Sequence, residues 1–205
     1  MDLFIADTHL GHENILVTCR PQFQTIEQMN ALIIQNINEK MTKRDTLYIV
    51  GDFSYRSDYS SVIGFLEAIK PKKVLIKGNH DPDWLRHFSD QEIDRYFEGV
   101  YEQYGYKKFG IEVHLNHFPQ LAWSRSHYFA QSFSICGHIH NDRNVNLAAR
   151  LFDQVNCQFN AGVDIHDFYP VTFAELVENN TRFYQRQYTE QEQELLEAAI
   201  KKLMS

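Results

Sequence analysis

Residues 3–9 read Leu3-Phe4-Ile5-Ala6-Asp7-Thr8-His9, a short apolar run that ends in side chains able to bind metal. Four later segments repeat this order. In each, an apolar run at 47–50, 74–76, 111–115 or 133–136 precedes Asp52, Asn79, His117, or the pair His138 and His140. Runs of this length with β-branched or aromatic residues are typical of buried strands. The sequence therefore predicts an α/β fold with a polar cluster at the end of each of five strands.

These clusters are predicted to converge on one site. Residues i and i+2 of an extended segment point to the same side, so Asp7 with His9, and His138 with His140, are expected to present paired ligands. In open α/β sheets, sites are built at the carboxyl ends of the strands. A glycine also precedes Asp52, Asn79 and His138, where it permits a sharp turn.

The predicted ligand set is four His, two Asp and one Asn, which favours Zn, Fe, Mn, Co or Ni over Ca or a lone Mg. Seven ligands are too many for one ion, and two ions about 3.5–4 Å apart need a shared ligand. Asp52 is the predicted bridge, because it stands without a neighbouring ligand and a carboxylate has two oxygens. The chain has 10 His, so one such motif is weak evidence, but all five in this order favour a metal site over coincidence.

The pattern D-x-H, G-D, G-N-H-D, N-H and G-H-x-H resembles that of the calcineurin-like metallophosphoesterase superfamily. Residues 7–15, with Arg20, Pro21 and Phe23, are similar to a small bacterial and phage branch of it. The resemblance runs from Leu3 to about Asp164. It implies a layered β-sandwich flanked by helices, an αββα arrangement, which agrees with the alternation of predicted strands and helices.

The resemblance also implies roles for individual residues. One metal would be held by Asp7, His9, Asp52 and His140, and the other by Asp52, Asn79, His117 and His138. A hydroxide bridging the metals would attack phosphorus, and His80 would be the general acid that protonates the leaving oxygen. Apart from the resemblance, the carboxylate of Asp81 or another acid is expected to orient the ring of His80. The two metals are expected to be Mn, Fe, Zn or Ni, with Mn the expected activator in vitro.

Further contacts to an anionic substrate are expected from polar residues close to these motifs: His12, Asn14, Arg20, Arg56 and Arg125. Tyr55, Trp84 and Trp123 could stack on a base or belong to the core. Relatives that act on phosphoproteins read G-D-x-x-D-R-G and G-N-H-E, whereas this chain reads GDFSYRS at 51–57 and GNHD at 78–81. These departures favour small phosphodiesterase or nucleotidase relatives.

The chain has 205 residues, enough for one α/β domain and short for two, so a single domain over residues 1–205 is predicted. Apolar periodicity predicts one helix that begins at Thr25 and another that begins at Ser60 or Ser61. It predicts two more helices, which cover about residues 84–97 and 189–204. The apolar stripe of the C-terminal helix is expected to pack on its own domain, with a homodimer contact as the alternative. Residues 81–117 have room for a helix, a turn and a strand.

The formal net charge of -7 counts against binding of long nucleic acid duplexes, which usually leaves a basic footprint. Two divalent ions could still make the local potential at the site positive. The 3 Cys lack a zinc-like spacing and suggest reduced thiols. With no visible signal peptide or membrane-spanning run, the sequence predicts a cytoplasmic protein that does not contact membranes.

Three functions are consistent with these residues. The first is a small-molecule phosphodiesterase or nucleotide phosphatase, which the short segments between motifs favour. The second is a nuclease or nucleic-acid end-processing enzyme, which would need a basic groove formed by Lys40, Lys43, Arg44, Lys70, Lys72 and Lys73. The third is a noncatalytic scaffold, which would be expected to have lost ligands or the acid histidine.

Overall fold

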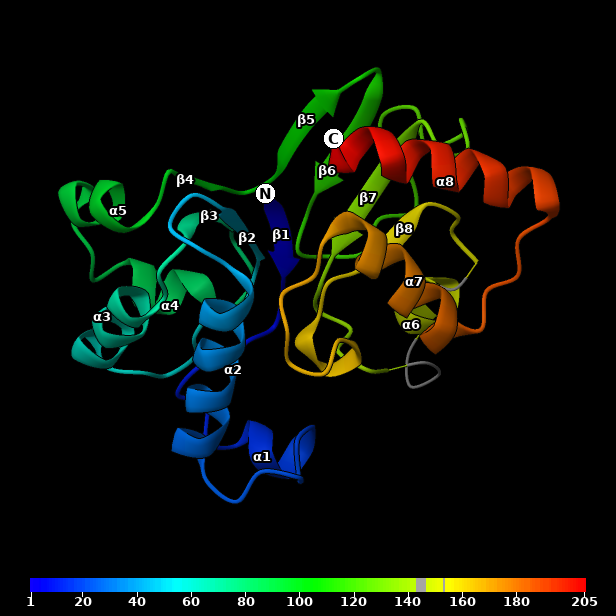
Figure 1. The fold of residues 1–205 in the computed structure, drawn as a ribbon. Coiled ribbons are helices and arrows are strands. Elements are labelled where there is room, and N and C mark those ends of the chain that lie inside the picture. Colours follow the sequence, from blue (N-terminus) through cyan, green and yellow to red (C-terminus); the bar gives the residue numbers. More distant parts are fainter. Residues whose placement is uncertain (143–146, 153) are drawn as a thin grey trace.

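The computed structural model describes residues 1–142, 147–152 and 154–205, and within them the strands form two four-stranded sheets (Figure 1). The first sheet is parallel and has the order β1 (Asp2–Ile5), β2 (Thr46–Val50), β3 (Lys72–Ile76), β4 (Gly99–Tyr101). The second has the order β5 (Tyr104–Lys108), β6 (Ile111–Leu115), β7 (Ser132–Cys136), β8 (Gln158–Asn160). In it β5 is antiparallel to β6, and the other pairs are parallel.

The helices fall into two groups along the chain. The connections of the first sheet contain α1 (Ile15–Thr18), α2 (Ile26–Lys40), α3 (Tyr59–Ala68), α4 (Asp81–Leu85) and α5 (Asp90–Tyr96). The later part contains α6 (Leu147–Phe152), α7 (Phe173–Tyr184) and α8 (Glu190–Met204), with the short 3-10 helix η1 (Val163–Ile165). No helix in the described residues has both the length and the apolar character needed to cross a bilayer.

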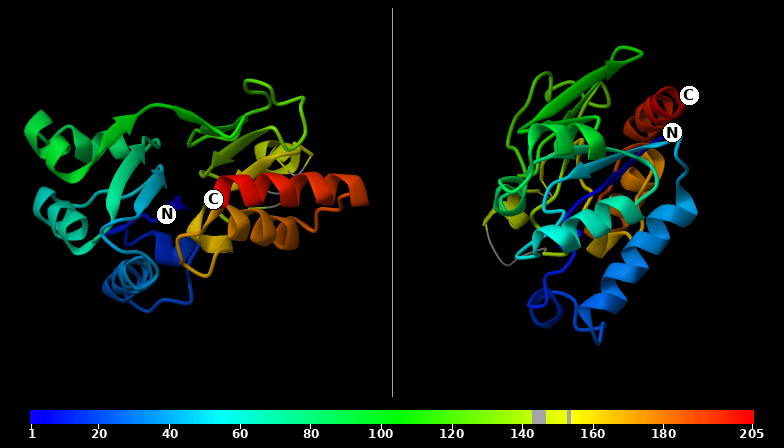
Figure 2. Two further views of the ribbon diagram at one scale, coloured as in Figure 1. Left: turned by 45° about the horizontal axis from the view of Figure 1, so that its top comes forward. Right: turned by 90° about the vertical axis from the view of Figure 1, so that its left-hand side faces the viewer.

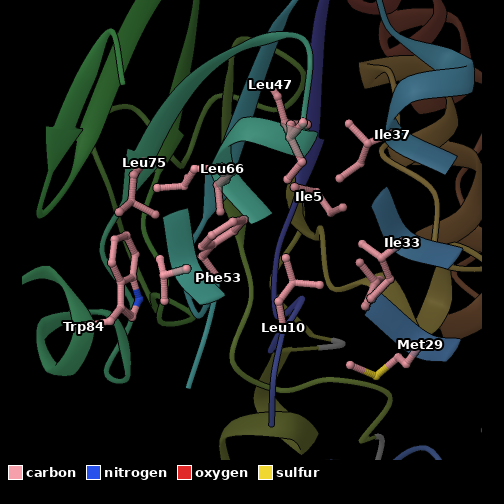
Figure 3. Close-up of a cluster of buried hydrophobic side chains, with 14 of the residues drawn as sticks. Ile5, Leu10, Met29, Ile33, Ile37, Leu47, Phe53, Leu66, Leu75 and Trp84 are labelled. Carbon is pink, nitrogen blue, oxygen red and sulfur yellow. The ribbon is translucent and has the colours of Figure 1, made fainter. Parts of the chain in front are cut away.

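Strand β1 separates two apolar cores, because its successive side chains point to opposite faces. Leu3 and Ile5 pack with residues of α2 and α3 in the first core, part of which Figure 3 shows. Phe4 and Ala6 belong to the second core, which also receives side chains from β6, β7, α7 and α8. The predicted layered α/β fold, with two sheets and flanking helices, is confirmed.

The edge of β1 that does not face β2 pairs with the segment after β8. The backbone N–H of Ala6 donates to Ala161 O at 2.8 Å, and the N–H of Val163 donates to Ala6 O at 3.1 Å. The N–H of Phe4 donates to Val171 O at 2.8 Å. This pairing holds residues 161–164 beside the chain that leaves β1.

Most predicted helices are present, with differences at their ends. Thr25 caps α2 as expected, whereas α3 begins at Tyr59 because the side chain of Asp58 accepts from the N–H of Ser61. The single helix predicted around 84–97 is two helices, since a capping box of Ser89 and Glu92 starts α5 anew. Strands β4 and β5 were not predicted; in β5, half-buried and exposed residues alternate without a strong apolar run.

The C-terminal helix packs on its own domain. Leu196, Ala199 and Leu203 of α8 are buried in the second core, and α8 lies beside α7 in both views of Figure 2. Leu195, on the other side of the stripe, is 45% exposed. The predicted packing role of this helix is confirmed for the three buried residues.

Candidate metal centre

The seven predicted ligands come together beyond the carboxyl ends of β1, β2, β3, β6 and β7. Within each of two groups, the potential ligand atoms lie within 4.8 Å of one another: Asp7, His9 and His140 in one, and Asp52, His117 and His138 in the other. Asn79 adjoins the second group. Its Oδ1 lies 3.2 Å from His117 Nε2 and 3.0 Å from His138 Nδ1.

Asp52 lies between the two groups. Its Oδ2 is 3.7 Å from His9 Nε2, which belongs to the first group, and 3.4 Å from His117 Nε2, which belongs to the second. Its Oδ1 accepts from the backbone N–H of His80 at 2.9 Å. Burial alone would raise the pKa of Asp52, but His117 and the N–H of His80 lower it to about 2. The carboxylate is therefore ionised and faces both groups of histidines.

A left-handed backbone presents many of these side chains. Asp7 has φ 55° and His9 has φ 47°, and Asp52, His138 and His140 also have positive φ. Non-glycine residues seldom adopt this conformation, and those that do are often found at functional sites. Strand β1 ends at Ile5, so the expectation that extended i and i+2 geometry pairs Asp7 with His9 was wrong. Two left-handed residues flanking Thr8 produce the pairing instead.

Two glycines allow the ligand loops to approach closely. Gly51 has φ +91°, and a Cβ there would lie 2.1 Å from His117 Nδ1. At Gly78 a Cβ would lie 2.2 Å from Asp52 Oδ1 and 2.5 Å from the backbone N of Asp52. Both contacts are far shorter than van der Waals distance, so only glycine fits at these positions.

Gly78→Ala is expected to lower the free energy of unfolding by about 1–3 kcal/mol, because the new methyl group forces Asp52 and its loop to move. Gly64→Ala is the matched control, since a Cβ at Gly64 on α3 meets nothing within 4 Å. It should stabilise the protein by about 0.5–1 kcal/mol. Urea titrations of both variants measure these changes, and equal stability of Gly78→Ala and wild type would contradict the steric argument.

Hydrogen bonds at the ring nitrogen Nδ1 orient two histidines of the cluster, His117 and His140. His117 Nδ1 donates to Val50 O at 3.0 Å, which leaves Nε2 facing Asp52 and Asn79. His140 Nδ1 donates to Asp164 Oδ2 at 2.9 Å. Hydrogen bonds of this kind fix the tautomer and ring direction of metal-binding histidines.

Arg20 supports the first group from within the protein. Its side chain is fully buried, and its Nε donates to Asp164 Oδ1 at 2.7 Å. The guanidinium also donates to the backbone carbonyls of Asp7 and Thr8. The expectation that Arg20 contacts substrate is thus corrected, because burial and these partners turn its donors inward.

The sequence suggested that Asp81 orients the ring of His80, but in the structure Asp81 has other partners. Its buried carboxylate accepts from the backbone N–H groups of Asp52, Phe53 and Gly78, and from Trp84 Nε1. Burial raises the pKa of Asp81 to about 6, against the opposing effect of these donors. Its structural effect is to join the loop after β2 to the loop after β3.

The chemistry of the cluster fits divalent cations. Nε2 of His9 is buried and has no hydrogen-bond partner among the described residues. Burial, then the nearby His140, lowers the pKa of His9 to about 2, so the ring is neutral and its lone pair is available. Burial also raises the pKa of Asp7, whose two oxygens accept only a backbone N–H, that of His138, within the described part of the chain. A cation would satisfy both groups.

His80 and several predicted substrate contacts lie at the more open side of the cluster. The ring of His80 is 5.4 Å from that of His9, and the Tyr55 ring lies 4.0 Å from it. His12 and Asn14 line a pocket together with Gly11, Glu13 and Arg56. His12 Nδ1 is 3.3 Å from His9 Nδ1. These positions bring three of the five predicted anion contacts to one polar pocket beside His80.

Arg125 lies elsewhere. Its guanidinium contacts Glu112 at 3.4 Å and Gln131 at 2.8 Å, next to the beginnings of β6 and β7. The metal cluster lies beyond the opposite ends of these strands, so the predicted substrate contact is corrected. Of the three aromatic residues considered for base stacking, Trp84 is buried in the first core, Trp123 Nε1 donates to Ser132 Oγ, and Tyr55 lies at the site.

Comparison with known proteins agrees with this geometry. The family model described as calcineurin-like phosphoesterase matches residues 3–156, which contain all seven predicted ligands. The chain belongs to the calcineurin-like phosphoesterase family. Members of this family are hydrolases of phosphoesters that normally use a dinuclear metal centre.

Two relatives extend the comparison without adding a substrate. The uncharacterized protein MJ1445 of Methanocaldococcus jannaschii is 35% identical over 78 residues, which cover 38% of this chain and 44% of the relative. The chain thus matches less than half the length of that protein. The crystal structure of the protein of unknown function AQ665 from Aquifex aeolicus is similar with a TM-score of 0.62 and 26% identity. That match covers 87% of this chain and 98% of the other.

The sequence analysis missed the structural role of Asp164. The carboxylate joins Arg20 to His140 and is itself almost completely buried. Ionisation of Asp164 is favoured by His140 and Arg20, which lower its pKa in spite of the burial that opposes it. The available signal was the segment Asn160-Ala161-Gly162-Val163-Asp164, in which Asn160 ends strand β8 and Asp164 lies in the turn that follows.

Proposed function

We propose that this protein hydrolyses a small phosphodiester or phosphomonoester at a centre of two divalent metal ions. The observation that carries the proposal is the placement of Asp52 between two separate groups of histidines. Asp7, His9, Asp52 and His140 would hold one ion, and Asp52, Asn79, His117 and His138 the other. Bound there, divalent cations would neutralise phosphoryl oxygens and lower the pKa of an attacking water.

The residues around the cluster have separate tasks in this proposal. His80 would hold a proton for the leaving oxygen, since its ring is 29% exposed and lies beside His9. Tyr55 packs on that ring and limits its motion. His12, Asn14 and Arg56 would bind anionic oxygens of the substrate in the adjoining pocket. Arg20 and Asp164 would keep the Asp7 loop and His140 in position.

A nuclease function finds less support. The basic residues that could have formed a groove lie near the beginnings of β2 and β3, whereas the metal cluster lies beyond the ends of these strands. Lys40 pairs with Glu175, Lys72 pairs with Glu98, and Lys73 is buried. We therefore propose a small molecule, such as a nucleotide, as the substrate rather than long nucleic acid.

Purified protein is expected to hydrolyse bis-p-nitrophenyl phosphate only in the presence of a divalent transition metal, because the cluster consists of potential metal ligands. We expect Mn to be the strongest activator among Mn, Fe, Zn and Ni. Release of p-nitrophenolate is followed after chelation and metal-free dialysis, and again after each metal is added back. Full activity of the metal-free protein would refute the proposed metal dependence.

A further inference from the structure

A second pocket, apolar in character, lies between residues 119–121 and helix α6. It has a volume of about 360 Å³ and is lined by Pro119, Gln120, Leu121, Leu147, Leu151, Phe152, Val155 and Gln158. Leu121 is 74% exposed and Leu147 is 63% exposed, so two large apolar side chains face solvent at its edge. None of the eight lining residues that the structure describes carries a charge.

This pocket adjoins the metal cluster along the chain and in space. Phe118 precedes Pro119, and its ring lies 4.6 Å from the ring of His138 and 5.1 Å from that of His117. Phe118 is itself 46% exposed. Phe118 is therefore the apolar side chain that links the second set of ligands to the start of the pocket lining at Pro119.

The floor of the pocket is joined to the ligand loop as well. Phe152 belongs to the same buried cluster as Ile139, the residue between His138 and His140. Phe152 also packs on Tyr184 with 5.0 Å between ring centroids. Tyr184 Oη accepts from Asn160 Nδ2, which also donates to His140 O. One lining residue of the pocket, Phe152, thus packs in the same buried cluster as a residue of the loop that carries His138 and His140.

The two pockets next to the cluster differ in chemistry. The pocket of His12, Asn14 and Arg56 is polar and adjoins His80, the residue proposed to protonate the leaving oxygen. The apolar pocket adjoins His117 and His138 through Phe118. A phosphodiester has two ester groups, and this arrangement gives each of them a different environment.

We propose that the apolar pocket binds a hydrocarbon ester group of a phosphodiester substrate, the group that stays on phosphorus while the other one leaves towards His80. The inference rests on the proposed function and adds the substrate class, an alkyl phosphodiester. The volume lies within the range of small-molecule pockets, roughly 300–1,000 Å³. Burial of the hydrocarbon against Phe118, Leu121 and Leu147 supplies the binding energy.

The test uses methyl, butyl and octyl p-nitrophenyl phosphates, which share one leaving group and differ only in the retained ester group. Water forms the new P–O bond, the P–O bond to p-nitrophenolate breaks, and the products are the alkyl phosphate, p-nitrophenolate and a proton taken up by buffer. Each buried CH₂ is worth about 0.8 kcal/mol, or roughly fourfold. We expect kcat/KM to rise at least about tenfold from methyl to octyl.

Two exposed residues allow variants that should fold normally. Leu121→Asn and Leu147→Asn are expected to reduce the octyl-to-methyl ratio of kcat/KM at least about threefold each. Leu195→Asn is the matched control, because Leu195 is also an exposed leucine but lies on α8, outside the pocket. It should leave the ratio unchanged.

Binding of methyl and octyl phosphate, measured by calorimetry, separates this inference from the proposed function. Tighter binding of octyl phosphate that Leu121→Asn abolishes supports the pocket even if no ester is hydrolysed. A flat chain-length dependence of both binding and kcat/KM in an active protein overturns it. A second result would also overturn the inference: Leu121→Asn converts a dimer to a monomer but leaves the octyl-to-methyl ratio of kcat/KM unchanged. The pocket would then be a contact between two copies of the chain.

Discussion

Asp52→Ala is expected to lower kcat/KM by at least about 10³-fold, and to remove more metal than any other single ligand substitution. The Oδ2 atom of Asp52 lies 3.7 Å from His9 Nε2 and 3.4 Å from His117 Nε2, so one carboxylate faces both groups of proposed ligands. Its loss would leave two cations close together without the negative charge between them. Metal content per chain, measured by elemental analysis, should fall toward one ion or fewer.

Two variants make this result specific. Asp94→Ala removes an exposed carboxylate on α5 and should retain both metal content and activity. His117→Ala removes a ligand of one group only, so it should retain more metal than Asp52→Ala. If Asp52→Ala keeps two ions while His117→Ala loses both, Asp52 is not the bridge.

The position of the site could be predicted because it depends on a simple pattern. Strand-like runs precede Asp52, Asn79 and His117, and β2, β3 and β6 end next to these residues. Parallel strands bring their carboxyl ends to one edge, so residues far apart in sequence are expected to meet there. The structure places the ligand side chains together as that rule predicts.

The local backbone of the ligand loops could not be predicted in the same way. Alternation along an extended chain explains neither Asp7 nor His9, since both have a left-handed backbone held by tertiary contacts. The N–H of Asp7 donates to Gly51 O, and the N–H of His9 donates to Asp52 O. These hydrogen bonds depend on the loop after β2, 44 residues (51 − 7) and 43 residues (52 − 9) later in the chain.

The role of Arg20 also could not be predicted from the sequence. An arginine near a phosphate site is expected to bind anions, because its planar fork matches two oxygens. Its actual partner, Asp164, lies 144 residues away and reaches it only through the pairing of β1 with the segment after β8. Burial of this ion pair turns an expected substrate contact into support for His140.

The loss of kcat on replacing His80 is expected to be larger for leaving groups that depend more strongly on protonation. An alkoxide or ribose oxygen needs one, whereas p-nitrophenolate is stable at neutral pH without it. General acid catalysis typically contributes about 10²–10⁴-fold. His80→Asn is therefore expected to lose roughly that factor in kcat with a nucleotide or alkyl ester and distinctly less with a p-nitrophenyl ester. His87→Asn, an exposed histidine in the turn after α4, is the matched control and should change neither rate.

Metal content of His80→Asn decides between an acid and a ligand. The backbone N–H of His80 donates to Asp52 Oδ1, and this contact survives the substitution, so both ions should remain bound. The His80 side chain also lies close enough to His9 and Asp52 to share a cation with them, and loss of metal in the variant would make it a ligand. An equal loss of rate on both ester types, with both metals retained, would instead assign His80 to phosphate positioning. A loss confined to poor leaving groups is the outcome that only proton donation explains.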